Sequence, residues 1–243
     1  MQNSKQKNSI VSCLKELSYR YRHAWILSYG IIYLAWFAYL EQTVTKKFHI
    51  ITMPVDVKIP FCEYFIIPYM LWFAYVLCTV AYFFFYSTND YYRLCMFLFT
   101  GMTIFLVVST VYPNGHNLRP EVFARENWYT EIVGWLYETD TPTNLFPSIH
   151  VYNSLGTHIA IMRSSSLKNK KLLRVTSFVL CLLIILSTMF LKQHSVFDVL
   201  TACGLSAVMY YVIYGEAYKK VPATVRLHKR KKEQALEGLR LRM

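Results

Sequence analysis

The sequence predicts an all-α, polytopic membrane protein: a bundle of six transmembrane helices with a further helix in an outer surface loop. Composition is the first indication. Of the 243 residues, 55% are hydrophobic and 16% are charged, whereas soluble domains carry about 25% charged residues. The other two indications are long apolar runs and an uneven distribution of basic residues between the loops.

Six stretches are long and apolar enough to cross a bilayer, which takes about 20 mostly apolar helical residues. The first follows a basic segment, but it is too long for a signal-peptide core and lacks a small-residue cleavage pattern, so we expect it to be retained. The expected domains are an N-terminal segment 1–23, a membrane domain 24–215 and a basic tail 216–243. The spans are expected near 24–44, 64–86, 95–113, 147–163, 173–191 and 195–215.

Basic residues predict the orientation of these spans. If the N-terminus is cytoplasmic, the cytoplasmic segments hold 20 of the 26 Lys and Arg residues, as the positive-inside rule requires. We therefore expect a plasma membrane protein with both termini in the cytoplasm, and the sequence is compatible with a bacterial host. The basic tail either touches anionic lipid or serves as a solvated topology signal, and the second interpretation is favoured.

The net charge of +12 and the six cysteines restrict the function classes. Because the basic residues follow the topology, the charge does not indicate a nucleic-acid partner. The cysteines are scattered, mostly within apolar runs, and form no C-x-x-C or His/Cys cluster. This pattern supports neither a disulfide framework nor a zinc site, so the sequence predicts no metal and no cofactor.

The longest loop on the outer side, 114–146, has apolar residues at helical spacing from Val122 to Tyr137. This spacing predicts an amphipathic helix, which either lies on the membrane surface or packs over a site below it. The loop also contains Arg119 and His116, two groups that can contact an anion.

Because successive spans cross the membrane in opposite directions, three chemically distinctive residues are expected on the outer side. His150 lies in the first turn of the fourth expected span, His194 lies just before the sixth at about the same depth, and Arg119 is in the outer loop. Each alone has an ordinary structural explanation, since a histidine at the membrane interface is more often structural than catalytic. Their joint occurrence at one depth favours a functional site.

The residues around these three fit phosphoryl transfer. His194 and Asp198 are spaced i, i+4 and are expected to share a helix face. An aspartate in an apolar helix is costly to bury alone, and pairing with it would leave the other imidazole nitrogen free as a base or nucleophile. Pro147 and Ser148 are typical of a helix start, where backbone N–H groups bind anions. The guanidinium of Arg119 is suited to phosphate.

Four further polar residues carry weaker predictions. His158 lies deep in the fourth expected span and is expected to be structural and hydrogen-bonded. Glu63, near the outer end of the second, is ambiguous. His116 is near Arg119 and either helps to bind an anion or is solvated, and Lys192 is a second weak candidate for anion binding.

At these residues the sequence resembles the type 2 phosphatidic acid phosphatase superfamily, also called the lipid phosphate phosphatases. The resemblance covers roughly 60–215 and implies the same six-span core. The three motifs of that family are K-x6-R-P, P-S-G-H and S-R-x5-H-x3-D. Their counterparts here are "YPNGHNLRP" (112–120), "PSIH" (147–150) and "STMFLKQHSVFD" (187–198).

The resemblance implies a metal-independent reaction through a phosphohistidine. His194 would attack phosphorus while Asp198 holds its imidazole, and His150 would protonate the leaving group and then help to activate the acceptor. Arg119 and Ser148 would bind the phosphoryl oxygens. The implied substrate, in contact with the bilayer, is a lipid phosphate or diphosphate of the outer leaflet, such as phosphatidate, phosphatidylglycerol phosphate or polyprenyl diphosphate.

Three positions depart from the family pattern. Tyr112 replaces the lysine of the first motif and Thr188 the arginine of the third, both of which contact phosphate in the family. Ile149 replaces the glycine of the second motif. Lys192 or His116 would have to compensate for the lost charge.

The departures leave three functions open. Hydrolysis is favoured, because nothing in the sequence marks a site for a second lipid. Transfer of a phospho-head group to a lipid alcohol is an alternative, since the inositol-phosphorylceramide and sphingomyelin synthase branch also keeps the two histidines and the aspartate without the full set of cations. A non-catalytic binding or transport protein is less favoured, because a transporter is expected to place its charged groups near the bilayer midplane.

Overall fold

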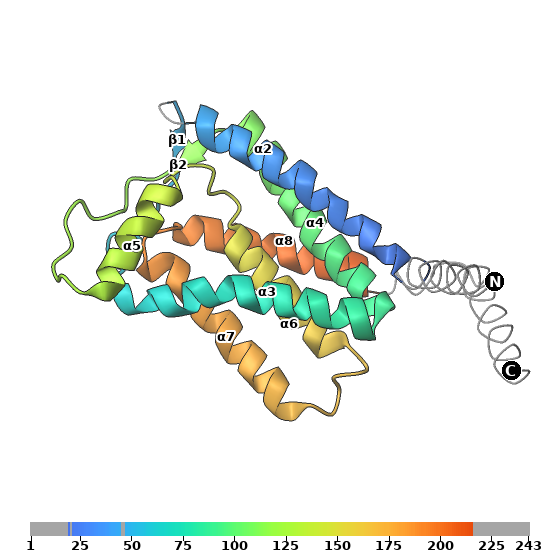
Figure 1. The fold of residues 1–243 in the computed structure, drawn as a ribbon. Helices are drawn as coiled ribbons and strands as arrows, with labels where there is room; N and C mark the ends of the chain where they lie inside the picture. The colour runs from blue at the N-terminus through green and yellow to red at the C-terminus, as the bar shows by residue number, and fades with distance from the viewer. Residues whose placement is uncertain (1–18, 20, 45–46, 216–243) are drawn as a thin grey trace, which may run out of the picture.

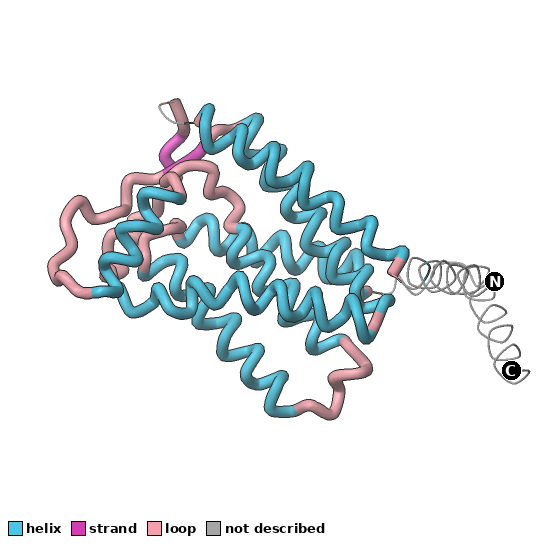
Figure 2. Tube along the Cα trace, viewed as in Figure 1, coloured by secondary structure: helices cyan, strands magenta, loops and turns pink. Residues whose placement is uncertain are grey.

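The computed structural model describes residues 19, 21–44 and 47–215, and this part of the chain is mostly helical (Figures 1 and 2). The expected tail 216–243 and nearly all of the expected N-terminal segment 1–23 lie outside the described residues. In chain order the elements are η1 (Arg22–Ser28), α2 (Tyr29–Thr43), β1 (His49–Ile50), η2 (Glu63–Phe65), α3 (Ile66–Tyr86), α4 (Thr88–Val111), β2 (Asn114–Gly115), α5 (Trp128–Thr139), α6 (Ile149–Arg163), α7 (Lys171–Phe190) and α8 (Val196–Tyr214).

Among the described residues, five helical segments are long and apolar enough to cross a membrane, in agreement with the expected membrane protein. Each corresponds to one of the expected spans, and most of their ends agree to within a few residues. They are Arg22–Thr43, Glu63–Tyr86, Thr88–Val111, Lys171–Phe190 and Val196–Tyr214.

The fourth expected span, 147–163, corresponds to α6, which lies at the centre of the bundle. It contacts α3, α4, α7 and α8. Its 15 residues give a length of about 22 Å, whereas the hydrocarbon core of a bilayer is about 30 Å thick. Because four helices surround α6, it does not have to face lipid along its whole length. The arrangement as six full spans therefore stays a prediction.

α4 begins well before the position expected near 95, because the carboxylate of Asp90 at its start is satisfied by hydroxyls just outside the helix. The carboxylate of Asp90 accepts hydrogen bonds from the hydroxyls of Ser87 and Ser164, each at 2.8 Å. A negative charge in the first turn is also favourable toward the helix dipole. Asp90 therefore belongs to the helix and joins it to the segment after α6.

Two glycines allow α4 and α6 to approach closely. Gly101 on α4 faces the ring of Tyr152 on α6, and Gly156 on α6 faces the ring of Phe97 on α4. The two rings stack with centroids 4.7 Å apart, and the hydroxyl of Tyr152 donates to the carbonyl of Phe97 at 2.8 Å. Small residues at such contacts are typical of membrane helix packing.

Small polar side chains are buried among the apolar ones of the interior, and many large apolar side chains also face outward. Ser154, Ser187 and Ser206 are buried, and each donates to a carbonyl of the preceding turn of its own helix at 2.6 to 2.7 Å. These bonds satisfy the hydroxyls without a partner helix. On α7, large side chains such as Leu172 and Phe178 are exposed, as expected of a surface that meets lipid.

α5 covers one end of the bundle, where β1 and β2 pair in parallel (Figure 1). The helix expected near 122–137 begins at Trp128, because the side chain of Asn127 accepts from two backbone N–H groups of its first turn. Val133 and Leu136 pack against the start of α3. Packing over a site, one of the two expected placements, agrees with this position, and contact with the membrane surface stays a prediction.

The close approach of α4 and α6 gives a stability prediction. In Gly101→Ala the new methyl group would overlap the buried ring of Tyr152, so we expect a loss of about 1–3 kcal/mol, as for overpacked cores. Gly204→Ala is the matched control, since a Cβ there meets nothing within 4 Å. Thermal unfolding in detergent measures both variants, and equal transition temperatures would contradict the proposed interface.

Candidate active site

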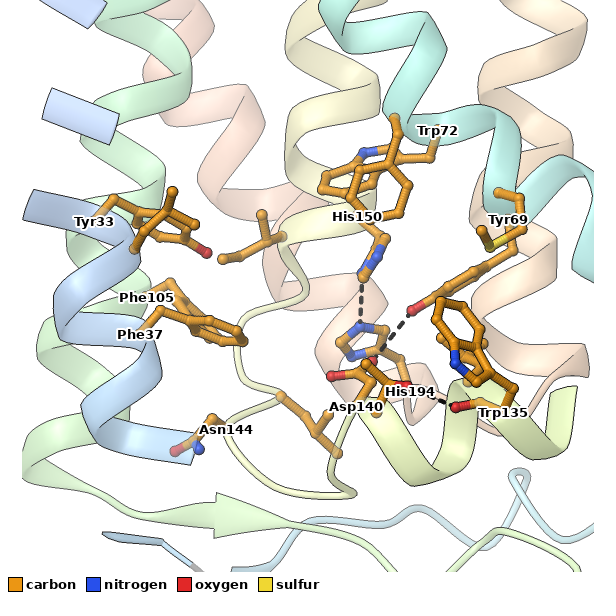
Figure 3. Close-up of a pocket in the computed structure, with 17 residues that line it drawn as sticks. Tyr33, Phe37, Tyr69, Trp72, Phe105, Trp135, Asp140, Asn144, His150 and His194 are labelled. Carbon is orange, nitrogen blue, oxygen red and sulfur yellow. Dashed lines mark hydrogen bonds between the residues drawn. The ribbon is translucent and has the colours of Figure 1, made fainter. Parts of the chain in front are cut away.

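A cavity of about 340 Å³ lies at the end of the bundle that α5 covers (Figure 3). Its aromatic walls come from α2, α3, α4 and α5, and the start of α6 and the turn between α7 and α8 contribute the two histidines expected at one depth. The residues that line it include Tyr33, Phe37, Tyr69, Trp72, Phe73, Phe105, Trp135, Asp140, Asn144, His150 and His194.

His150 and His194 lie next to each other in this cavity. Nε2 of His194 is 3.4 Å from Nδ1 of His150 (Figure 3). His150 is the second residue of α6, and its ring packs against those of Tyr69 and Trp72, with centroids 4.6 and 4.3 Å away. The helices alternate in direction, so the start of α6 and the turn before α8 fall at the same end of the bundle.

Asp198 lies beside His194, but not in the way that the spacing predicted. His194 precedes α8 and is outside the helix, because Ser195 is the N-cap. The carboxylate of Asp198 completes a capping box by accepting from the N–H of Ser195 at 2.9 Å. The capping turn, rather than a shared helix face, brings Oδ2 of Asp198 to 3.4 Å from Nδ1 of His194.

The contact between Asp198 and His194 is not a hydrogen bond, since Nδ1 of His194 and Oδ1 of Asp198 have no hydrogen-bond partner. Burial, with a smaller contribution from the charge of Arg119, lowers the pKa of His194 to about 3. The imidazole is therefore neutral at physiological pH. The nearby carboxylate is placed to stabilise a positive charge that forms on the ring during a reaction.

Ser148 is the N-cap of α6, as the sequence predicts. Its hydroxyl accepts from the N–H of Val151 at 3.4 Å, and its own N–H donates to the carbonyl of Asp198 at 3.4 Å. Ser148 is fully buried and joins the starts of α6 and α8. Its expected contact with phosphate stays a prediction.

Arg119 is anchored next to the cavity rather than in its wall. Its guanidinium donates to the carbonyls of Tyr137 and Asp140 at 3.1 and 2.8 Å, and to the side-chain oxygen of Gln193 at 2.6 Å. It also lies 4.5 Å from the centre of the Tyr137 ring. Because Gln193 directly precedes His194, the charge of Arg119 is held close to the proposed nucleophile.

Lys192 and His116, the weaker anion-binding candidates, are engaged elsewhere. The ammonium of Lys192 donates to the carbonyls of Asp56, at 2.7 Å, and Ile59. One ring nitrogen of His116 accepts from the N–H of Leu118 at 3.2 Å, and the other is 3.0 Å from the carbonyl of Gln193. Burial lowers the pKa of His116 to about 4, so the ring is neutral. Neither position supports the expected contact with an anion.

Tyr112 and Thr188 stand where the resembled family has a lysine and an arginine. Neither side chain contacts the cavity in place of the missing cation. Thr188 is fully buried, and its hydroxyl donates to the carbonyl of Ile185 in its own helix at 2.8 Å. Tyr112 is partly exposed and stacks on His49 with ring centroids 4.3 Å apart.

Two residues with uncertain roles in the sequence have structural partners. Nδ1 of His158 is 2.9 Å from the hydroxyl of Ser177 on α7, in agreement with the expected hydrogen-bonded position. Glu63 is buried and forms an ion pair with Arg125 at 3.1 Å. Glu63 therefore joins the start of α3 to the outer loop.

Sequence reasoning missed three residues next to the histidines: Gln193, Asp140 and Asp56. Gln193 is adjacent to His194 in sequence, which is a usable signal. Asp140 follows α5 and lines the cavity. Asp56 is buried in a loop, and its carboxylate accepts from the N–H of Val196, the first residue of α8, at 2.8 Å; no sequence pattern marked it.

Unpaired polar atoms gather at the turn that carries His194. Nε of Arg119, Nε2 of Gln193 and Nδ1 of His194 are buried and have no hydrogen-bond partner. Unpaired buried polar groups each cost about 1–3 kcal/mol and usually have a functional explanation. Two of these groups are always donors, so an oxyanion next to the turn would relieve the cost.

Part of the chain matches a known family. Residues 117–221 match the PAP2 superfamily. This segment is less than half of the chain and contains Arg119, Ser148, His150, His194 and Asp198. The search of curated proteins and the search of solved structures found no match.

The lowered pKa of His194 gives a prediction about its charge. An ordinary histidine is half protonated near pH 6.5, but a ring with a pKa of about 3 stays neutral above that pH. We expect the ¹H–¹⁵N signals of His194, assigned by their absence in His194→Gln, to keep the neutral pattern from pH 7 to pH 5. A transition near pH 6.5 would show that the ring is not buried as described.

Proposed function

We propose that the protein is an integral membrane enzyme that hydrolyses a lipid phosphate or diphosphate through a phosphohistidine on His194. The observation that carries the proposal is the contact between a neutral, buried His194 and His150 in the wall of one cavity. The match of residues 117–221 to the PAP2 superfamily supports a phosphatase or a related phosphotransferase activity.

In the first step, Nε2 of His194 attacks phosphorus as the bond from phosphorus to the lipid oxygen breaks, and His150 gives its proton to that oxygen. In the second step, His150 takes a proton from water, whose oxygen attacks phosphorus as the bond to His194 breaks. Asp198 stabilises the charged imidazole between the two steps, and Arg119 with Gln193 stabilises the phosphoryl oxygens. These residues perform the reaction without a metal ion.

A second candidate, transfer of a phospho-head group to a lipid alcohol, is favoured by one observation. Positions 112 and 188 supply no cation to the site, so a doubly charged phosphate monoester would meet only the guanidinium of Arg119 there. Incubation with a labelled lipid phosphate separates the candidates: free phosphate indicates hydrolysis, and a new labelled lipid indicates transfer.

The nucleophile is tested by His194→Gln. Because no phosphohistidine can form, we expect turnover at background and no labelled protein after a reaction with labelled lipid phosphate is quenched with detergent at alkaline pH, where phosphohistidine is stable. His158→Gln is the matched control, since it removes an imidazole of α6 that contacts Ser177 rather than the cavity. Appreciable turnover by the His194→Gln variant would end the assignment and favour a binding protein.

The role of the carboxylate is tested by Asp198→Asn. The amide keeps an acceptor for the N–H of Ser195, so α8 should remain capped, but the charge that stabilises the imidazolium is lost. By comparison with other His–Asp pairs, we expect kcat to fall by about 10²- to 10⁴-fold, with an unchanged melting temperature. An undiminished rate in the purified variant would contradict this role.

A further inference from the structure

We propose that a groove between α3 and α7 binds an anionic phospholipid of the membrane leaflet opposite the candidate active site. One acyl chain of the lipid would lie in the groove, and its phosphate would contact the basic residues of the loop between α6 and α7. The groove shares no lining residue with the cavity that contains His150 and His194. The lipid site is therefore independent of the proposed function.

The groove has a volume of about 270 Å³. Its walls come from residues 75–82 of α3 and 173–180 of α7, together with Leu167 in the loop after α6. Cys78 and Thr176, which also line it, are exposed, so the groove opens on the outer surface of the bundle. Because α3 and α7 are both long and apolar enough to cross a membrane, this surface would meet lipid chains.

The buried polar side chains of the groove are already paired. The hydroxyls of Tyr75 and Ser177 are 2.7 Å apart, and the hydroxyl of Ser177 is 2.9 Å from Nδ1 of His158. The hydroxyl of Thr79 donates to the carbonyl of Tyr75 at 2.8 Å. A polar ligand would gain little from these groups, whereas a hydrocarbon chain leaves all of their hydrogen bonds intact.

The size of the groove also favours a flexible chain over a folded partner. An α-helix with its side chains is about 10–12 Å across, so docking of a helix would require a long trough rather than a pocket of about 270 Å³. A single acyl chain has no polar groups to satisfy and can enter a narrow opening between two spanning helices. We therefore assign the groove to the acyl chain of a lipid.

Four basic residues beside the groove form what we call the basic cluster: Lys168, Lys170, Lys171 and Arg174. Leu167 and Leu173, which line the groove, are next to members of the cluster in sequence. The chain has no acidic residue between Asp140 and Asp198, and within the part of the chain that the structure describes the cluster forms no salt bridge. Positive charge beside an apolar groove matches the two parts of an anionic phospholipid.

The α6–α7 loop keeps the cluster together and leaves its ammonium groups exposed. The guanidinium of Arg174 donates to the carbonyl of Lys168 at 3.1 Å and to the sulfur of Met162 at 3.2 Å. The three lysines of the cluster are exposed. Asp90, whose carboxylate reaches this loop, accepts from the hydroxyl of Ser164 at 2.8 Å and does not neutralise the lysines. Basic pockets between spanning helices bind anionic head groups in this way.

The direction of α7 determines the leaflet. Lys171 is the first residue of α7, and the last residue of the helix, Phe190, leads into the turn that contains His194. Figure 1 shows the α6–α7 loop and α5 at opposite ends of α7. A lipid whose phosphate lies at this loop therefore belongs to the leaflet opposite the candidate active site.

The basic cluster is tested by native mass spectrometry of the purified full chain in detergent, with phosphatidylglycerol and phosphatidylcholine of identical acyl chains. We expect the protein to bind phosphatidylglycerol at least about tenfold more tightly, and Lys168→Gln and Lys171→Gln each to weaken it about threefold. Arg163→Gln is the matched control, because it removes a charge that precedes the same loop but contacts Tyr210 on α8. It should leave the affinity unchanged.

The groove is tested by Thr176→Trp, which fills it from an exposed position. We expect this variant to lose phosphatidylglycerol binding by at least about tenfold, and the lipid to raise the melting temperature of the unmodified protein but not of the variant. Val175→Trp is the matched control, since Val175 is exposed on the same turn of α7 but does not line the groove. It should bind the lipid normally.

Three results would overturn the proposal. If Arg163→Gln weakened binding as much as the lysine variants, or if Thr176→Trp had no effect, the loop would act only through diffuse attraction, as a topology signal does. If inorganic phosphate displaced the lipid at equal concentration, the ligand would be a free anion. If Thr176→Trp instead abolished a dimer in the mass spectrum, the groove would be an interface between two copies of the chain.

The outcome does not depend on the proposed reaction. His194→Gln should bind phosphatidylglycerol at the groove as the unmodified protein does, because the turn that carries His194 is at the other end of α7. Loss of turnover in that variant and loss of lipid binding in Thr176→Trp are therefore separate results.

Discussion

The turn between α7 and α8 is the constraint on which the site depends, because buried polar contacts fix it on several sides. The ammonium of Lys192 holds the backbone of the loop at Asp56, and the carboxylate of Asp56 caps the first residue of α8. Gln193 connects the turn to Arg119 through its side chain and to His116 through its carbonyl. His194 lies between these anchors and has little freedom to move.

This anchoring explains why two residues that the sequence suggests as anion ligands have a structural role instead. Lys192 and His116 position the backbone around His194, and their polar atoms are already engaged. Arg119 is also engaged by carbonyls, but its Nε is unpaired beside the unpaired amide of Gln193. Preorganised donors of this kind stabilise charge that develops in a transition state without reorganising during the reaction.

The parts of the fold that were predictable depend on local sequence. Apolar runs of spanning length and alternating helix direction were enough to place five helices and to bring His150 and His194 to one end. The predicted start of α4 was wrong, because one of the two hydroxyls that satisfy Asp90 comes from Ser164, 74 residues later in the chain, and cannot be recognised locally. The bounds of α6 were close to those expected, but its enclosure by four helices is a property of the whole bundle and could not be recognised locally.

Within the site, contacts were predictable where one motif contains both groups or where alternating helix direction brings two helix starts together, as for His150 and His194. The pairing of His194 with Asp198 followed from their spacing, although a capping turn rather than a helix face produces it. Asp56 lies 140 residues before the N–H that it caps, and Asp140 meets Tyr69 across 71 residues. Such contacts depend on how loops fold over the bundle, so spacing carries no information about them.

The origin of the cavity walls determines how a lipid would reach the histidines. The rings of Tyr33 and Phe37 come from α2, and Trp72 and Phe73 come from α3; both helices are long and apolar enough to cross the membrane. In the proposed reaction these walls would contact the hydrocarbon part of a lipid substrate, whereas a site built only from outer loops would offer a lipid no such apolar wall. Asp140, His150 and His194 line the same cavity, so the phosphate of that lipid would lie at the end of the bundle that α5 covers.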